Sequence, residues 1–381
     1  MELKKLGILT FWNVPNYGAF MQAYALQKSL ENRYKEYLVK QIGYLNKKHF
    51  NVYYSNSLSS KYRYFIINLH FYKTLLKKIF LKLFSKNNSI VCSDLSNLKK
   101  FLNYYNSIPN FQCNKKSDLK KLQLDTLVLG SDIIWDYTVP FFGSDSFLFG
   151  NDINANIKIS YAVGSGSVKN AKSVPGYVEK GIKSLNAISV RDKNTEYFVK
   201  QITDKKTSIV LDPTLLWDFD NDSNVINPNL DNYIIVYGSF FSHELINGAK
   251  EYSKKHHLKL ICLSSLDDKF DWCDRIINQD ELSPFEWVGY FKYAKAVMTC
   301  TYHGLMFSLI FKKKIIFYMT NFILNKSESF IDELGLTDVI ISFKSFNEKI
   351  NWDWDYNLIS EKIDILRQKS FKFLDESIND K

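Results

Sequence analysis

The residue of this sequence best suited to chemistry is His303. It lies in the segment Thr301–Gly304, which follows the apolar run Val297–Cys300 and precedes a second apolar run. An imidazole at the amino end of a helix can bind a phosphate or carboxylate, and it can move a proton near neutral pH. A single His is more often structural, but a place directly after a buried strand favours function. We therefore expect Thr301, His303 and Gly304 to belong to a binding site.

Arg191 is a second candidate, and it ends the strand-like run Ala187–Val190. A fixed guanidinium at this position could form two parallel hydrogen bonds with a phosphate or a carboxylate. The alternative is an ion pair with Asp192 or Asp212, in which case Arg191 would serve the fold. The residues alone leave both roles open.

A turn near the start of the chain supplies weaker candidates. Asn16, Tyr17 and Gly18 lie between the strand-like run Leu6–Phe11 and a helical pattern of apolar residues. The amino ends of helices present free N–H groups, which suit anionic or hydroxyl-rich ligands. A plain turn between a strand and a helix is the alternative. We interpret these three residues as substrate-binding.

Two further turns also follow strand-like runs. Asp132 comes after Leu124–Leu129, and Ser165 lies in Gly164–Ser167, which matches neither the Walker motif nor G-x-G-x-x-G. We include both as substrate-binding candidates. The tripeptide Asp353–Asp355 has the D-x-D spacing of some glycosyltransferase metal sites, but it follows no strand. The sequence contains no paired Cys and His spacing typical of metal sites, so we expect neither a metal nor a cofactor.

Parallel sheets would bring these turns together, because ligands of open parallel sheets bind beyond the carboxyl ends of the strands. Strand-like runs alternate with helical patterns in two series, which an Asn/Asp-rich stretch at 221–231 separates. We therefore predict an α/β protein of two Rossmann-like domains, 1–220 and 232–345, that face each other across a cleft. A helical segment at 346–381 would pack back across both domains. Residues from about 50 to 120 break the rhythm and predict a helical insertion in the first domain.

Composition supports a folded chain in a reducing compartment. Of 381 residues, 46% are hydrophobic and 16% aromatic, which is ample for two cores and argues against disorder. The five Cys show no C-x-x-C spacing. The start of the chain lacks the apolar stretch of a signal peptide, and no uncharged apolar run approaches the roughly 18 residues of a membrane span. We expect a cytoplasmic protein.

The net charge of +10 requires nucleic-acid and membrane partners to be considered. Because Lys is abundant along the whole chain, we attribute the charge to compositional bias and expect no nucleic-acid partner. The segment 61–86 is more specific, since a helix there would be basic and amphipathic. Its basic residues are Lys73, Lys77, Lys78, Lys82 and Lys86. It predicts either a surface helix of the domain or a peripheral contact with the inner face of the plasma membrane.

Taken in order, these segments resemble the polysaccharide pyruvyl transferase family. The matching segments are Gly7–Phe11, Asn16–Ala19, Gln22–Gln27, Gly130–Asp132 with Trp135, Ser160–Ala162, Ser189–Asp192, Leu211–Leu216, and His303–Gly304 with Phe307–Ser308. Each segment is weak alone, but the ordered set is specific and spans roughly residues 6 to 335. The stretch from 50 to 120 adds nothing to the match.

The resemblance implies a GT-B-like pair of domains and a transferase. The expected reaction moves the pyruvyl group of phosphoenolpyruvate to hydroxyls of a cell-surface saccharide, free or lipid-linked, and forms a pyruvate ketal. Basic residues and a His bind the donor in the family, and His303 and Arg191 stand at the matching positions. Asn16, Tyr17 and Asp132 would line the acceptor side.

The sequence departs from the family pattern at Thr301, where many members carry an Arg. Either another basic residue replaces that charge, or the donor differs. Two alternatives therefore stay open beside the pyruvyl transferase: a GT-B glycosyltransferase that uses a nucleotide-sugar, and a sugar-binding relative without catalysis.

Overall fold

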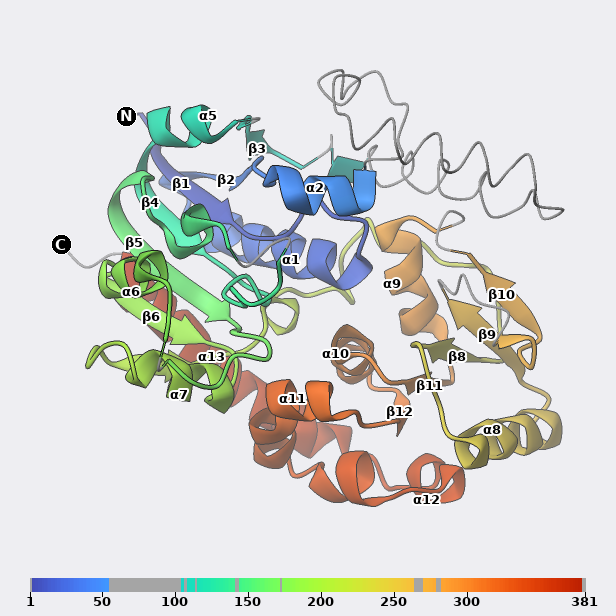
Figure 1. Ribbon diagram of the computed structural model, residues 1–381. Helices are drawn as coiled ribbons and strands as arrows, with labels where there is room; N and C mark the ends of the chain where they lie inside the picture. The colour runs from blue at the N-terminus through green and yellow to red at the C-terminus, as the bar shows by residue number, and fades with distance from the viewer. Residues whose placement is uncertain are drawn as a thin grey trace, which may run out of the picture.

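The structure, a computed structural model, describes residues 2–54, 104–105, 108–113, 115–140, 144–171, 173–263, 270–278 and 282–378 (Figure 1). The chain forms two α/β units, and each is built on a parallel sheet. The predicted helical insertion at about 50–120 falls for the most part outside the described residues. The Lys-rich segment 61–86 falls entirely outside them, so its contact with a membrane stays a prediction.

The first sheet positions the turns of the amino-terminal half. Its strand order is β3-β2-β1-β4-β5-β6-β7. The strands are β1 (Lys4–Leu9), β2 (Tyr37–Ile42), β3 (Asn110–Phe111), β4 (Gln123–Leu129), β5 (Asn154–Val163), β6 (Ala187–Val190) and β7 (Thr207–Ile209). The chain order reverses between β1 and β4, so the turns after these two strands border one crevice.

The second sheet has the order β10-β9-β8-β11-β12 and reverses between β8 and β11. Its strands are β8 (Tyr233–Tyr237), β9 (Lys259–Leu263), β10 (Arg275–Ile277), β11 (Ala296–Thr299) and β12 (Lys314–Phe317). Apolar residues fill the centre of each strand because both faces of the sheet are buried. The predicted α/β class with two Rossmann-like, GT-B-like domains is confirmed.

Helices cover the sheets and carry the side chains of interest at their amino ends. In the first unit they are α1 (Tyr17–Arg33), α2 (Lys47–Tyr54), α5 (Lys116–Lys121), η2 (Ser146–Phe149), α6 (Gly176–Lys183), α7 (Lys193–Lys200) and η3 (Pro213–Leu215). In the second unit and after it they are α8 (His243–Lys255), α9 (Pro284–Tyr293), α10 (Tyr302–Ile310), α11 (Asn321–Leu334), η6 (Asp338–Ser342), α12 (Phe346–Ile350) and α13 (Tyr356–Ile378). Side-chain caps begin several of them, as Ser283 does for α9.

An apolar core runs across the boundary between the two units. The ring of Tyr17 on α1 stacks on Trp287 of α9, with the ring centroids 5.5 Å apart. Tyr24 contacts Phe285 edge to face at 5.0 Å. Such aromatic pairs contribute beyond the area they bury. The two units are therefore held face to face by a shared core and not by a linker alone.

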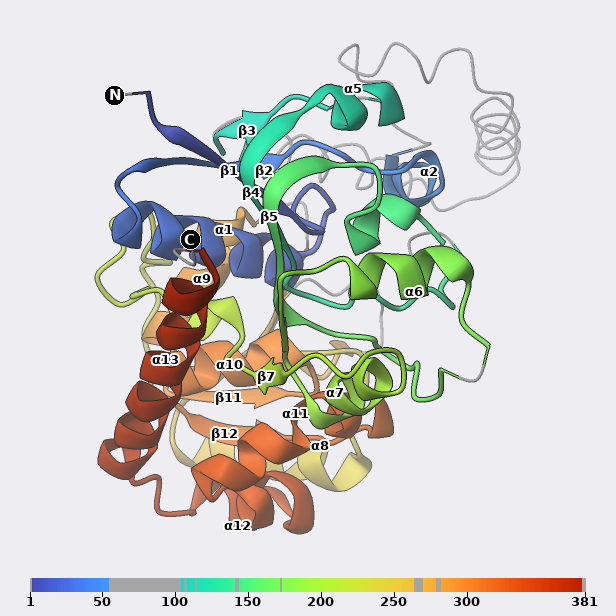
Figure 2. The same ribbon diagram turned by 90° about the vertical axis from the view of Figure 1, so that its left-hand side faces the viewer.

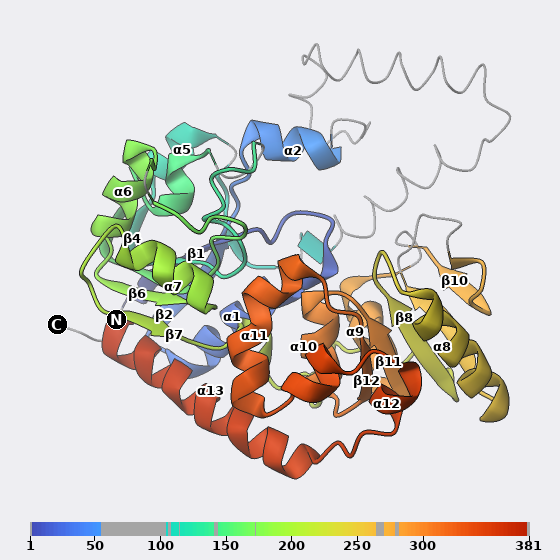
Figure 3. The same ribbon diagram turned by 60° about the horizontal axis from the view of Figure 1, so that its bottom comes forward.

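The chain crosses between the units a second time through α13. Helix α12 packs on α8 and β12 in the second unit. Figures 2 and 3 show α13 running from beside α12 to α1, and α13 packs on β5 within the first sheet. There Arg33 Nε donates to Asp375 Oδ1 at 2.6 Å, and Leu211 N–H donates to Ser370 Oγ at 3.0 Å. The carboxyl-terminal helix thus completes the surface of the first unit.

Candidate functional site

A cavity of about 240 Å³ lies between the two units, at the carboxyl ends of strands from both sheets. The turns after β1, β4 and β6 border it from the first unit, and α10 and α11 border it from the second. Its lining residues are Phe11, Val14, Asn16, Ala19, His49, Asp132, Ile133, Arg191, Tyr302, His303 and Lys326. This is the place where two facing parallel sheets are expected to bind a ligand.

His303 reaches the cavity from the first turn of α10. Thr301 begins this helix, and its Oγ1 accepts a hydrogen bond from Gly304 N–H at 3.0 Å. The side chain of His303 is 15% exposed, and its ring lies against Gly18 of the first unit. A Cβ atom on Gly18 would stand 2.1 Å from His303 Nδ1. The ring can occupy this position only because residue 18 has no side chain.

Arg191 reaches the same cavity from the end of β6 and forms a buried ion pair. Its Nη1 donates to Asp212 Oδ2 at 3.0 Å, and the two side chains are 2% and 0% exposed. The guanidinium also lies 4.3 Å from the centroid of the Tyr302 ring. The pair with Asp212 is therefore formed, whereas Asp192 caps α7 by accepting from Thr195 N–H. Arg191 still lines the cavity, and its Nε has no hydrogen-bond partner within the described ranges.

Burial and neighbouring charges set the protonation states of His303 and Asp212. Burial lowers the pKa of His303 below its usual value, although the carboxylates of Asp212 and Asp132 act in the opposite direction. Burial also opposes the charge of Asp212, but the Arg191 guanidinium and the hydrogen bonds from Thr214 hold the pKa of this carboxyl below its usual value. At pH 7, His303 is thus neutral while the pair of Arg191 with Asp212 is charged. The distance from His303 Nε2 to Asp212 Oδ2 is 3.9 Å.

Two of the other predicted residues lie at the cavity. Asn16 lines it and begins α1, because its Oδ1 accepts from Ala19 N–H at 3.0 Å. Asp132 lines it with a left-handed backbone, at a φ of 69°, and its Oδ1 accepts from Ile133 N–H. The sequence interpretation therefore identified the turns after β1 and β4 that form one wall.

Other predicted residues are used by the fold. Tyr17 lies in the core between the units, and its hydroxyl donates to the Leu282 carbonyl at 3.2 Å. Ser165 is buried, and its Oγ donates to the Val168 carbonyl, which closes its own turn. Neither Gly304 nor Thr301 lines the cavity: Gly304 packs against Thr299, and Thr301 caps its helix. All four residues lie in segments that follow strands, as the sequence indicates. Their side chains, however, pack in the core, close a turn, cap a helix or leave room for Thr299.

Among the lining residues that the sequence interpretation missed are Lys326 and His49, whose side chains can carry a charge. Lys326 lies on α11 and is 7% exposed, in register with the buried Ile323 and Ser327. A Lys on the apolar stripe of a helix is the signal that could have identified it. His49, on α2, is buried with its ring edge-on to Phe11 at 4.7 Å. No pattern in the sequence pointed to it, since it precedes a stretch without clear periodicity.

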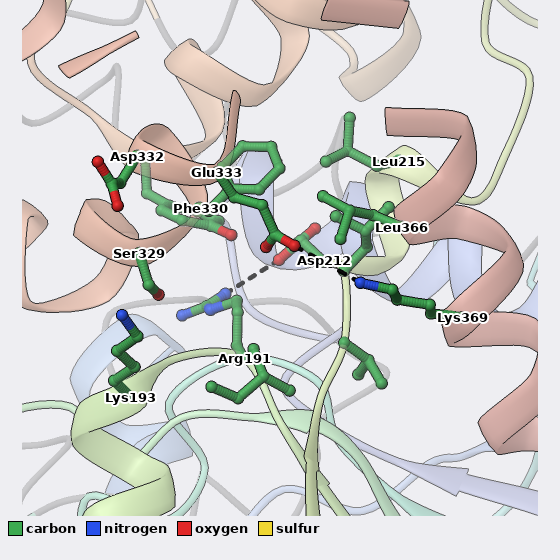
Figure 4. Close-up of a pocket in the computed structure, with 14 residues that line it drawn as sticks. Arg191, Lys193, Asp212, Leu215, Ser329, Phe330, Asp332, Glu333, Leu366 and Lys369 are labelled. Carbon is green, nitrogen blue, oxygen red and sulfur yellow. Dashed lines mark hydrogen bonds and ion pairs between the residues drawn. The ribbon is translucent and has the colours of Figure 1, made fainter. Parts of the chain in front are cut away.

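A second pocket, of about 460 Å³, lies beside the first and shares Arg191 and Tyr302 with it. Figure 4 shows Arg191 pointing to Asp212 below Phe330, while the Glu333 and Lys369 side chains approach each other across the opening. This pocket is larger but does not include His303 and lies on the flank, between β7, α11 and α13. We therefore regard the smaller cavity, which faces both sheets, as the candidate active site.

Searches for metal and membrane features gave two findings. Within the described ranges, there is no group of three or more His, Cys, Asp or Glu side chains placed to hold a metal ion. Among the helices of the described residues, none is both long and apolar enough to cross a membrane.

Known structures resemble this chain in fold. The structure of S. aureus MnaA with UDP matches with a TM-score of 0.50 and 11% identity, covering 99% of this chain and 97% of that one. UDP-GlcNAc 2-epimerase from Methanocaldococcus jannaschii, in complex with UDP-GlcNAc and UDP, gives a TM-score of 0.44 and 13% identity over 96% and 99%. The first match supports the GT-B-type arrangement of two parallel sheets and nothing about ligands. A search of curated proteins gave no match.

The family comparison covers the residues that build the cavity. The sequence model described as polysaccharide pyruvyl transferase matches residues 16–321. This range begins at the cap of α1 and includes Arg191 and His303, and it spans most of the 381 residues. The chain therefore belongs to the polysaccharide pyruvyl transferase family and is a transferase.

Proposed function

We propose that this protein transfers the pyruvyl group of phosphoenolpyruvate to two hydroxyls of a saccharide and forms a pyruvate ketal. The observation that carries the proposal is the size and lining of the cavity that His303 and Arg191 share. Pockets for drug-sized ligands begin at about 300 Å³. The cavity of about 240 Å³ is smaller, which favours a three-carbon donor over a nucleotide-sugar.

The position of the cavity also suits an anionic donor. Helix α1 begins at Tyr17 in the first unit and α10 begins at Tyr302 in the second, and residues of both first turns line the cavity. The amino end of a helix carries a partial positive charge, and its first N–H groups lack partners within the helix. Two such ends from two domains would attract the phosphate and the carboxylate of the donor.

The proposed reaction adds one proton and two oxygens to the enol. A proton goes to the methylene carbon, and an acceptor hydroxyl oxygen bonds to the central carbon while the hydroxyl loses its proton. The bond from the central carbon to the phosphate oxygen then breaks, phosphate leaves, and a second hydroxyl closes the ketal. Of the two protons that the hydroxyls release, one restores the acid and the other leaves with phosphate.

His303 is the residue we assign to phosphate binding or proton transfer. It is neutral at pH 7, and the charge of an incoming dianion would raise its pKa, so that it gains a proton when the donor binds. Arg191 would bind the anion through the part of its guanidinium that does not contact Asp212. Asn16 and Asp132, which line the cavity from the turns after β1 and β4, would face the acceptor hydroxyls.

The test is a comparison of donors with the purified protein. We expect phosphoenolpyruvate to bind in calorimetry, and to release phosphate when methyl hexopyranosides with neighbouring free hydroxyls are supplied as acceptors. The ketal carbon would be visible by ¹³C NMR. If phosphoenolpyruvate does not bind while a UDP-sugar binds and releases UDP, the glycosyltransferase alternative is correct. If a saccharide binds and no donor does, the protein is a sugar-binding relative without catalysis.

A further inference from the structure

We propose that Asp212 is a positioning residue for the reaction: its buried carboxylate holds a proton on His303 Nε2 and leaves Nδ1 as the nitrogen that exchanges protons with the substrates. The inference rests on the proposed function and adds to it which nitrogen reacts and which residue selects it. Asp212 caps η3 in the first unit, whereas His303 lies in the first turn of α10 in the second. The reacting nitrogen would thus be selected where the two units meet.

The two ring nitrogens of His303 have different surroundings. The side chain is 15% exposed, yet Nε2 itself is buried and has no hydrogen-bond partner among the described residues. It faces Asp212 Oδ2, which lies 3.9 Å away. Nδ1 lies against Gly18 in the first turn of α1, and other residues of that turn line the cavity. We therefore take Nδ1 as the nitrogen on the donor side of the ring.

Asp212 is held so that its charge stays beside the ring. Its Oδ2 accepts from Arg191 Nη1 at 3.0 Å, and its Oδ1 accepts from the N–H and the hydroxyl of Thr214 at 3.0 and 2.7 Å. The side chain is 0% exposed, so water and salt screen its charge little. Burial opposes this charge, but Arg191 and Thr214 keep the pKa of the carboxyl below its usual value. Asp212 is therefore ionised at pH 7.

A fixed negative charge decides which nitrogen of a neutral imidazole carries the proton. An N–H that points at a carboxylate is stabilised, whereas a lone pair at the same place is repelled. Burial lowers the pKa of His303; among the charged groups that act on it, Asp212 has the largest effect and raises the pKa, as Asp132 also does. Arg191 and Lys326 lower it. Asp212 is thus the main charge that favours a proton on Nε2.

This assignment gives the protons of the reaction definite places. When the donor dianion binds, Nδ1 takes up a proton and the ring becomes an imidazolium, with its Nε2–H still facing Asp212. Nδ1 then gives its proton to the methylene carbon. Its freed lone pair takes the proton that an acceptor hydroxyl loses as the hydroxyl oxygen bonds to the central carbon. Nε2 keeps its proton throughout, and the carboxylate stabilises the imidazolium without itself being protonated.

The first experiment is ¹⁵N NMR of the full chain, labelled at its six His residues. A protonated ring nitrogen and a bare one differ in chemical shift, and the spectrum of His303→Gln identifies the signals of His303. For wild type at pH 8 without donor, we expect a proton on Nε2 and a bare Nδ1. A proton on Nδ1 would overturn the inference, whatever the variants do.

Asp212→Asn removes the charge, and Asp192→Asn is the matched control. Both carboxylates are buried and accept from the N–H and the hydroxyl of a Thr, which is Thr214 for Asp212 and Thr195 for Asp192. In Asp212→Asn the Nε2–H form should no longer dominate. The alkaline limb of kcat with phosphoenolpyruvate should move to lower pH by about one to three units, because the imidazolium loses its neighbouring charge.

Above this limb, the rate of Asp212→Asn should fall roughly 10- to 10³-fold and return when the pH is lowered. Asp192→Asn should keep both the tautomer and the limb of wild type. If folded Asp212→Asn keeps them too, or loses rate at every pH, the inference is overturned and the proposed function stands. If Asp212→Asn does not fold, the tautomer of wild type decides. If wild type releases no phosphate from phosphoenolpyruvate, the proposed function fails and the inference fails with it.

Discussion

Gly18→Ala would show whether the position of His303 controls the reaction. The new Cβ would lie 2.1 Å from Nδ1 and 2.5 Å from Cγ of the ring, whereas ordinary contacts begin at 3.4 Å. The imidazole must therefore move by more than 1 Å, because residue 18 is fixed within the first turn of α1. A misplacement of about 1 Å in a catalytic group can cost roughly 10²-fold in rate. We expect kcat/KM to fall by about this factor, which corresponds to about 2.7 kcal/mol of transition-state stabilisation.

The fold should change much less than the rate. Ala in place of Gly favours a helix by up to about 1 kcal/mol, and a tight new contact costs about 1 to 3 kcal/mol. The free energy of unfolding should therefore change by no more than about 2 kcal/mol. Gly176→Ala is the control, since Gly176 begins α6 and a Cβ there would meet no atom within 4 Å. We expect that variant to retain full activity.

The assay is acceptor-dependent phosphate release, measured beside a urea unfolding curve. The double variant Gly18→Ala, His303→Ala should be no slower than His303→Ala alone, because both changes act through the same ring. If Gly18→Ala keeps its rate within threefold of wild type, or if its effect multiplies with that of His303→Ala, the reasoning is refuted.

Three further outcomes are expected. His303→Ala should lower kcat by roughly 10² to 10³ with an intact fold, and turnover within threefold of wild type would contradict its assignment. Arg191→Lys should raise the donor KM and leave the acceptor KM nearly unchanged, because an ammonium cannot reproduce the planar two-pronged contact of a guanidinium with an anion. A change in the acceptor KM alone would mean that Arg191 contacts the acceptor and not the donor. Burial lowers the pKa of His49 to about 4, so as the pH falls this side chain takes up a proton in the unfolded state before it does so in the folded state. The free energy of unfolding should therefore fall by on the order of 3 kcal/mol between pH 7 and 4. Chemical unfolding across this range should show a smaller loss for His49→Gln, and an equal loss would contradict the argument.

The fold was predictable because its signals are local. Buried strands such as Leu6–Leu9 are short apolar runs, and caps such as Ser283 and Asn16 mark where helices begin. His303 and Arg191 could be singled out for the same reason, since each directly follows an apolar strand.

The composition of the site was less predictable. Turns, caps and binding sites use the same polar residues, and the sequence alone could not show that Ser165 serves its own turn. It also could not show that Tyr17 faces Trp287, because that contact joins residues 270 positions apart. Lys326 was missed because it lines the cavity only where the second domain packs against the first.

The path of α13 also affects how the protein is made. Tyr161 and Leu211 lie in the same core cluster as Leu374, and the Leu211 N–H is paired with Ser370. During translation, the first domain emerges from the ribosome long before these late residues are synthesised. Part of the apolar surface of the first domain and the Leu211 N–H therefore lack their partners on α13 until the end of the chain has been synthesised. We infer that the first domain reaches its final packing only after the second domain has been made, so that the two become stable together.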